Sequence, residues 1–190
     1  MTQQQELFET PTVLPNGLVY VPDFLSEGEE RDLLDGIAAT DLREAQYKEY
    51  TAKRRVASFG AGYDFSEQEL TPAPALAPFL LPLRSRVALW LQVPAEEFGY
   101  ALIAEYRPGT QLGWHRDVPQ FEMVAGVSLA SPARMRFRPF PPIRKDRILA
   151  LDLAARSAYV LRDDVRWKWQ HSIAPTRELR YSITFRTRSK

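Results

Sequence analysis

The sequence predicts an α+β fold that is mainly β, with two helices in the first half of the chain and an antiparallel sandwich or barrel in the second. Before residue 92, apolar residues recur at helical spacing in two segments. From Phe98 onward, short apolar or alternating segments are separated by turn residues, which is typical of an all-β sandwich or barrel. A chain of 190 residues is long enough for one domain with its own core, so we expect residues 1–190 to fold as a unit.

The composition limits the kinds of site and partner. With 45% hydrophobic and 12% aromatic residues the chain is globular, and with no cysteine any metal must be held by histidines and carboxylates. No apolar run approaches the roughly 18 residues of a membrane span, and residues 1–6 are too polar for a signal peptide. We therefore expect a cytoplasmic protein without a membrane partner. The net charge of +1 neither requires nor excludes nucleic acid.

The first half begins with a lead-in over residues 1–17, which ends in the turn residues Pro15, Asn16 and Gly17. A short apolar strand is expected at 18–21. Ser26 and Glu29 have the spacing of a capping box, so they mark the start of a helix that we expect to end near 36–40.

A second helix is expected within residues 75–92, after a proline-rich passage at 71–74. Leu83 and Val87 lie on one face of this helix, as they would in a helix packed against a sheet. Pro82 is expected in its first turn, where proline is tolerated, or at a kink.

Between Tyr47 and Tyr63, basic residues alternate with aromatic residues. Lys53, Arg54 and Arg55 are the central cations of this segment. Such a mixture can bind a phosphate backbone and stack on a base. It is more typical of a hairpin whose charged face is merely solvated. The residues alone leave both readings open.

The second half contains a series of predicted strands. They cover residues 98–106, 123–129, 134–138, 148–153, 157–161, 166–171 and 180–186. Alternation in 134–138 places three arginines on one face and two apolar side chains on the other. The same alternation in 166–171 predicts that Trp167, Trp169 and His171 share a face. Those indoles would then flank His171, or simply pack in the core.

The last predicted strand carries Arg180, Ser182, Thr184 and Arg186 on one face and three apolar side chains on the other. An arginine inside a small barrel needs a partner, because an isolated buried charge is costly. A nearby carboxylate, solvent or a dicarboxylate ligand can each fill that need.

The segment 114–117 contains one of the two histidines of the chain. In an extended strand His115 and Asp117 point to one face, while Trp114 and Arg116 point to the other. The second histidine, His171, lies 54 residues after Asp117. Two histidines and one carboxylate form the facial triad of non-haem Fe(II) oxygenases.

These motifs follow one another in a distinctive order. Along the chain come Tyr106-x-x-Gly109, His115-x-Asp117, His171 and Arg180-x-x-x-x-x-Arg186. Over about residues 18–188 the chain resembles the AlkB family of Fe(II)/2-oxoglutarate-dependent dioxygenases. The similarity is most specific in "LIAEYRPGTQLGWHRD" and "RYSITFR".

The resemblance implies a double-stranded β-helix, or jelly roll, over 98–188, preceded by two supporting helices. It implies that His115, Asp117 and His171 hold Fe(II), and that 2-oxoglutarate and O₂ are cosubstrates. Apart from the metal ligands it implies no catalytic side chain.

For the cosubstrate, the resemblance implies that Arg180 binds the distal carboxylate of 2-oxoglutarate with help from the Tyr106 hydroxyl. Arg186 supports the end nearer the metal. Two asparagines that are common in the family are replaced by Ala104 and Ser182. Both positions are expected to touch the cosubstrate, so we expect 2-oxoglutarate to make fewer hydrogen bonds or differently arranged ones.

For the substrate, the resemblance implies a hairpin-like lid over residues 41–66 that recognises a nucleotide. The residues expected to contact substrate are Arg54, Arg55, Tyr63, Trp114 and Trp169. On the family's pattern the substrate is alkylated DNA or RNA, single-stranded or with the base flipped out, and the alkyl group leaves as an aldehyde. No obligate protein partner is indicated.

Three hypotheses follow. The first is oxidative demethylation of nucleobases, as in alkylation repair. The second keeps the dioxygenase chemistry but acts on a protein side chain or small molecule. The third is a non-catalytic nucleic-acid-binding domain with a vestigial iron site. The first is favoured if the cations at 53–55 and the three arginines of 134–138 border one cleft.

Overall fold

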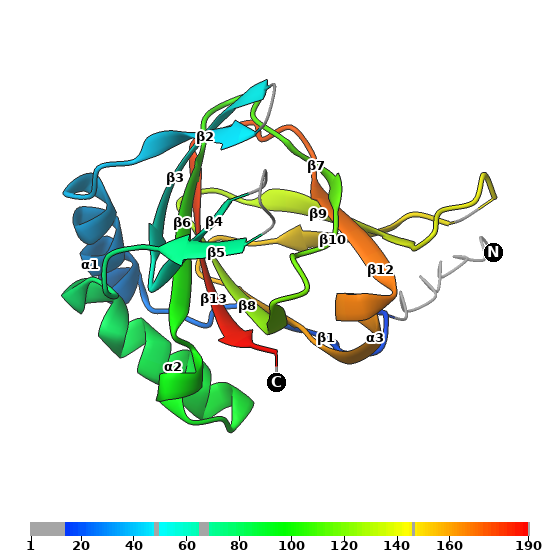
Figure 1. The fold of residues 1–190 in the computed structure, drawn as a ribbon. Coiled ribbons are helices and arrows are strands. Elements are labelled where there is room, and N and C mark those ends of the chain that lie inside the picture. Colours follow the sequence, from blue (N-terminus) through cyan, green and yellow to red (C-terminus); the bar gives the residue numbers. More distant parts are fainter. Residues whose placement is uncertain (1–13, 48–49, 65–68, 146, 190) are drawn as a thin grey trace, which may run out of the picture.

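The computed structural model describes residues 14–47, 50–64, 69–145 and 147–189 (Figure 1). Its helices are α1 (Glu27–Ala38), α2 (Leu81–Leu91) and α3 (Asp163–Trp167), with short 3₁₀ turns η1 (Pro78–Leu80) and η2 (Ala95–Glu97). Its strands are β1 (Leu18–Val21), β2 (Arg43–Tyr47), β3 (Tyr50–Phe59), β4 (Ala61–Asp64), β5 (Glu69–Pro72), β6 (Tyr100–Tyr106), β7 (Leu112–His115), β8 (Phe121–Leu129), β9 (Ala133–Pro139), β10 (Leu149–Leu153), β11 (Ala158–Leu161), β12 (Trp169–Ile173) and β13 (Arg180–Arg188). Within these ranges no helix is long and apolar enough to span a bilayer.

Two antiparallel sheets dominate the molecule. The large sheet has seven strands in the order β1-β11-β8-β13-β6-β3-β2, and the small sheet has four in the order β10-β9-β12-β7. Strands β4 and β5 form a separate two-stranded ribbon. The large and small sheets face each other, and their pairing of strands distant in sequence is the jelly roll that was expected. The predicted mainly β fold class is confirmed.

Helix α1 begins where the capping box predicts. The Glu29 backbone N–H donates to Ser26 Oγ at 3.3 Å, and the Ser26 backbone N–H donates to Glu29 Oε2 at 2.8 Å. Both bonds satisfy amide groups that a helix start otherwise leaves without partners.

Both long helices cover the outer face of the large sheet (Figure 1). Ile37 of α1 and Val87 of α2 are buried in one apolar cluster with sheet residues such as Ile103 and Phe185. Pro82 lies in the first turn of α2, as predicted. This layer fixes the large sheet from outside and leaves its other face free to line the interior.

Strand β13 shows this division residue by residue. Ile183 and Phe185 face the helices, whereas Arg180, Ser182 and Arg186 face the space between the sheets. A second apolar cluster fills part of that space and includes Met135 and Phe137. The remainder is a cavity.

One predicted strand is partly wrong. Residues 163–167 form the short helix α3, and β12 starts only at Trp169. Two aspartates in the first turn favour the helix terminus, and Lys168 Nζ lies 2.8 Å from Asp164 Oδ1 one turn away. Trp167 therefore does not share a face with His171, and its Nε1 donates to Glu122 at 3.2 Å.

Residues 41–66 include the hairpin β2-β3, but this hairpin does not stand apart from the core. Strand β3 pairs with β6 from Arg55 opposite Glu105 to Phe59 opposite Ala101, so the hairpin extends the large sheet. Residues 48–49 and 65–66 of the expected lid lie outside the described residues.

Candidate functional site

A cavity of about 700 Å³ lies between the two sheets. Its walls come from both sheets and include the histidines, Asp117 and the inward-facing residues of β13. The lining residues used below are Arg54, Ala104, Tyr106, His115, Asp117, His171, Arg180, Ser182 and Arg186. A volume of this size is typical of small-molecule and cofactor pockets.

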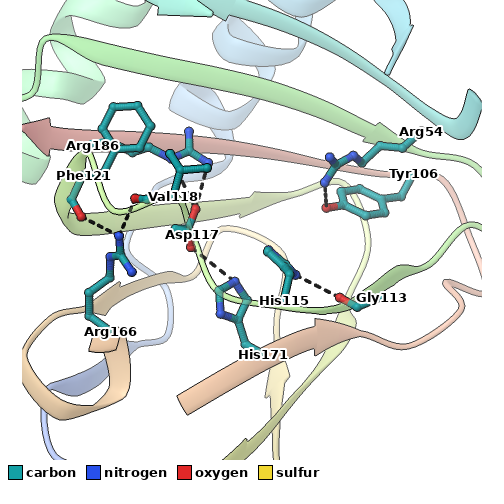
Figure 2. A network of polar contacts seen from close by, with 10 residues as sticks. All are labelled: Arg54, Tyr106, Gly113, His115, Asp117, Val118, Phe121, Arg166, His171 and Arg186. Carbon is teal, nitrogen blue, oxygen red and sulfur yellow. Dashed lines mark hydrogen bonds and ion pairs between the residues drawn. The ribbon is translucent and has the colours of Figure 1, made fainter. Parts of the chain in front are cut away.

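Three potential metal ligands meet in this cavity (Figure 2). His115 ends β7 and Asp117 follows it, while His171 lies directly opposite His115 on β12. The imidazole centroids are 4.2 Å apart, and one ligand atom from each residue lies within 4.8 Å of the other two. The spacing and donor types fit a facial triad for a divalent iron, with positions left for other ligands.

The orientation of His115 suits this role. Its Nδ1 lies 2.9 Å from the Gly113 carbonyl oxygen, which can only accept, so Nδ1 carries the proton (Figure 2). The lone pair is therefore on Nε2. This hydrogen bond fixes the tautomer in the manner usual for metal-bound histidines.

The charges of the triad also suit a metal. Burial and the nearby His115 lower the pKa of His171 to about 3, and burial lowers the pKa of His115. Burial opposes ionisation of Asp117, but the charge of Arg186 outweighs it and holds the pKa of Asp117 well below its usual range. At neutral pH the set is two neutral imidazoles and one carboxylate, which is the ligating form of each.

Two arginines hold Asp117 and the segment after it. Arg186 Nη2 lies 3.4 Å from Asp117 Oδ1. Arg166 of α3 is buried and donates through Nη2 to the carbonyls of Val118 at 2.7 Å and Phe121 at 2.5 Å (Figure 2). Sequence reasoning missed Arg166, because nothing in its local pattern indicates that it reaches a segment 45 residues earlier.

Arg180 is the most unusual charge in the cavity. Its side chain is almost fully buried at 1% exposure, its Nε donates to Ser128 Oγ at 3.0 Å, and its guanidinium lies 4.8 Å from the centroid of the Tyr106 ring. Its Nη1 has no hydrogen-bond partner, and no carboxylate among the described residues pairs with it. A buried cation in this condition calls for an anionic ligand.

Tyr106 lies between Arg180 and Arg54. Arg54 Nη1 donates to the Tyr106 hydroxyl at 3.3 Å (Figure 2). Burial raises the pKa of the phenol, but the charges of Arg54 and Arg180 outweigh it, so the pKa of Tyr106 is lowered. The row of three side chains presents positive potential to the cavity.

The other expected substrate contacts are not all brought to the cavity. Trp114 lies along its rim, but Arg136 and Arg138 cover its indole at 5.2 and 4.5 Å from the ring centroid. Trp169 packs against the second apolar cluster and does not line the cavity. Tyr63 is in β4, and its side chain lies outside the described residues.

Arg55, which was expected to contact substrate, lies on the opposite face of β3 from Arg54 and does not line the cavity. Its Nε and Nη2 donate to the two carboxylate oxygens of Glu105 at 2.8 and 2.6 Å. Glu105 is buried and also accepts from Arg107 and Tyr181. Adjacent residues of a strand point to opposite faces, so only one of the two arginines can reach the cavity.

Replacing Arg55 with alanine is expected to lower the free energy of unfolding by about 1 to 2 kcal/mol, because Glu105 loses its bidentate partner. The Arg55 hydrogen bonds hold the pKa of Glu105 below its ordinary value of 4.5. Their contribution to the free energy of unfolding is thus fully present above pH 4.5 and is lost as the pH falls through the lowered pKa of Glu105. Urea unfolding of the wild type and variant at pH 7 and pH 3 measures the difference.

Arg107→Ala is the matched control, since Arg107 contacts the same carboxylate but is 62% exposed. A smaller loss is expected there. If Arg55→Ala unfolds like the wild type at pH 7, the ion pair does not stabilise the fold.

Comparisons with known proteins agree with this geometry. A family model described as "2OG-Fe(II) oxygenase superfamily" matches residues 17–186. "Uncharacterized protein L905" of Acanthamoeba polyphaga mimivirus is 26% identical in an alignment of 189 positions, which covers 90% of this chain and 84% of that protein.

Two solved structures share the fold. That of OsALKBH1 has a TM-score of 0.67 at 16% identity and covers 92% of this chain and 98% of its own. That of a Pseudomonas putida prolyl-4-hydroxylase has a TM-score of 0.63 at 15% identity and covers 92% and 93%.

Proposed function

Because this chain belongs to the 2OG-Fe(II) oxygenase superfamily, it is an oxidoreductase that uses Fe(II), 2-oxoglutarate and O₂, and we propose that it demethylates N-alkylated nucleobases in DNA or RNA. The observation that carries the proposal is one cavity that contains both the triad and the buried, unpaired Arg180. The cavity therefore offers a metal site and an anion site to the same bound molecules.

In this proposal His115, Asp117 and His171 hold Fe(II). The iron, when bound, supplies the redox chemistry that couples decarboxylation of 2-oxoglutarate to oxidation of a C–H bond by O₂. Arg186 keeps Asp117 ionised and oriented, and the Gly113 carbonyl keeps His115 in the ligating tautomer.

Arg180 binds the distal carboxylate of 2-oxoglutarate, with the Tyr106 hydroxyl beside it. The guanidinium fork suits a carboxylate, and its free Nη1 provides a donor. Ala104 and Ser182 lie opposite each other on β6 and β13 and both line the cavity. Their small side chains leave the cosubstrate with fewer side-chain donors than two amides would supply.

The substrate enters the rest of the cavity. An alkylated base fits this path only when single-stranded or extruded from a duplex. Arg54 supplies a cation at the wall where a base and its phosphate arrive. The likeness to OsALKBH1 over nearly the whole chain supports a shared architecture.

The second candidate is the same chemistry on a protein side chain or small molecule. Two observations favour it: Arg55 and the three arginines of β9 do not line the cavity, and a prolyl-4-hydroxylase shares the fold. The cations therefore do not border one cleft, contrary to the condition that favoured nucleic acid.

A formaldehyde-release assay on methylated DNA and RNA oligonucleotides tests the proposal, with succinate formed without substrate as the background. Formaldehyde above the no-enzyme control, dependent on Fe(II) and 2-oxoglutarate, is the expected result. Succinate formation without formaldehyde from any methylated oligonucleotide would favour the second candidate.

A further inference from the structure

A cluster of arginines lies on the outer face of the small sheet and at the rim of the cavity. Met135 and Phe137 of β9 point inward and are buried, so the alternate residues Arg136 and Arg138 point outward. Arg116, after β7, is exposed. We call Arg116, Arg136 and Arg138 the outer arginine patch.

Stacking and hydrogen bonds to neutral groups hold the patch in place. The Arg138 and Arg136 guanidiniums lie 4.5 and 5.2 Å from the centroid of the Trp114 ring, and Arg116 lies 4.0 Å from that of Phe140. Arg136 Nε donates to Ser172 and Arg138 Nε to Gln170, at 3.0 and 2.8 Å. Arg116 Nη1 donates to the Trp167 carbonyl at 3.0 Å.

The charges of the patch are not compensated within the protein. None of its three arginines pairs with a carboxylate in the described part of the chain, whereas Arg134 on the same strand pairs with Asp152 at 3.2 Å. A charged sheet face is often merely solvated, with both signs interspersed. Three fixed guanidiniums without an acid are instead arranged for an anionic partner.

The patch is next to the opening of the cavity. Strand β7 is one of the two edge strands of the small sheet, and β2 is one of the two edge strands of the large sheet. The exposed residues that line the cavity include Arg43 on β2 and Gly113 and Arg116 at β7, so the cavity opens between these two edges. Around β7, the inner face carries His115 and the outer face carries the patch.

We propose that the outer arginine patch binds the phosphate backbone of the single-stranded nucleic acid whose base enters the cavity. This inference rests on the proposed nucleobase substrate. Guanidinium groups pair with phosphate through two donors, and their prior fixation by Trp114 and Phe140 reduces the entropy lost on binding. The patch thus provides phosphate contacts on the outer side of β7, in addition to the arginines that line the cavity.

The test compares the wild type with Arg136→Gln/Arg138→Gln in fluorescence anisotropy, with a labelled, unmodified oligonucleotide of about 15 nucleotides at several salt concentrations. The salt slope is the decrease in the logarithm of the binding constant per tenfold increase in salt, and each phosphate contact to a single strand contributes about 0.7 to it. Loss of two contacts is expected to reduce the slope by about 1.4 and to weaken binding about 25-fold near 0.1 M salt. The matched control is Arg31→Gln/Arg84→Gln, which removes the same charge from α1 and α2 on the far side of the large sheet.

A second measurement separates this inference from the proposed function. Formaldehyde release is compared for a methylated oligonucleotide and the same methylated nucleoside. Loss of rate by the patch variant on the oligonucleotide alone supports the patch. The inference is overturned if the patch variant and the wild type release formaldehyde at equal rates from both substrates, or if the salt slope of the variant is unchanged. In either case the proposed function stands. If the wild type releases formaldehyde from neither substrate, the proposed function fails. The anisotropy data still decide whether the patch binds nucleic acid. If the wild type does not bind the oligonucleotide, the inference is overturned.

Discussion

His115→Ala is expected to abolish Fe(II)-dependent conversion of 2-oxoglutarate to succinate and to leave the fold intact. His115 supplies one of three ligands, and two remaining ligands no longer form the facial set. Among the described residues the imidazole makes one hydrogen bond, to the Gly113 carbonyl, and His115 ends an edge strand, so its loss disturbs little packing. Succinate formation and circular dichroism measure the two parts of this result.

Thermal unfolding with added Mn²⁺, as a stand-in for Fe(II), provides the control. A bound ion stabilises the folded state by mass action, so the wild type is expected to show a raised Tm and His115→Ala is not. Turnover in His115→Ala within tenfold of the wild type would remove His115 from the metal site. Asp117→Ala is a less clean variant, because it also leaves Arg186 without its carboxylate.

Arg180→Ala is expected to weaken 2-oxoglutarate binding by about 3 kcal/mol, which is about 150-fold in Kd. The variant removes a buried guanidinium that has a free Nη1 and no carboxylate partner among the described residues. Titration of 2-oxoglutarate into the Mn²⁺-loaded protein by calorimetry measures the affinity directly.

Arg180→Lys is the matched control for charge alone. Lysine keeps the cation but lacks the planar fork, so an intermediate affinity is expected. The stability of each variant is measured in parallel, since removal of an uncompensated buried charge can itself stabilise the protein. Wild-type affinity for 2-oxoglutarate in Arg180→Ala would show that the guanidinium serves another anion.

The sequence predicted the parts of the fold that depend on local pattern. The Ser26 capping box placed the start of α1, and the alternation in β13 separated Arg180 and Arg186 from Ile183 and Phe185. The spacing of His115 and Asp117 in an extended segment likewise predicted that they point the same way.

What the sequence missed depends on which strand lies beside which. Alternation shows that Arg54 and Arg55 face opposite ways, but only the pairing of β3 with β6 decides that Arg54 faces the cavity. Arg166 contacts Val118 through tertiary packing alone. The helix α3 was missed because its five residues are too few to show a helical period.

The position of β7 at the edge of the small sheet has a consequence for dynamics. Strand β7 has four residues and, among the described strands, pairs with β12 alone; that ladder shifts register between His171 and Ile173. Such an edge is where local opening costs least free energy. An ion held by ligands from both strands would close the 54-residue loop from Asp117 to His171, as a cross-link does. The iron would then also cross-link β7 to β12, and amide hydrogen exchange in residues 112–115 would slow when it binds.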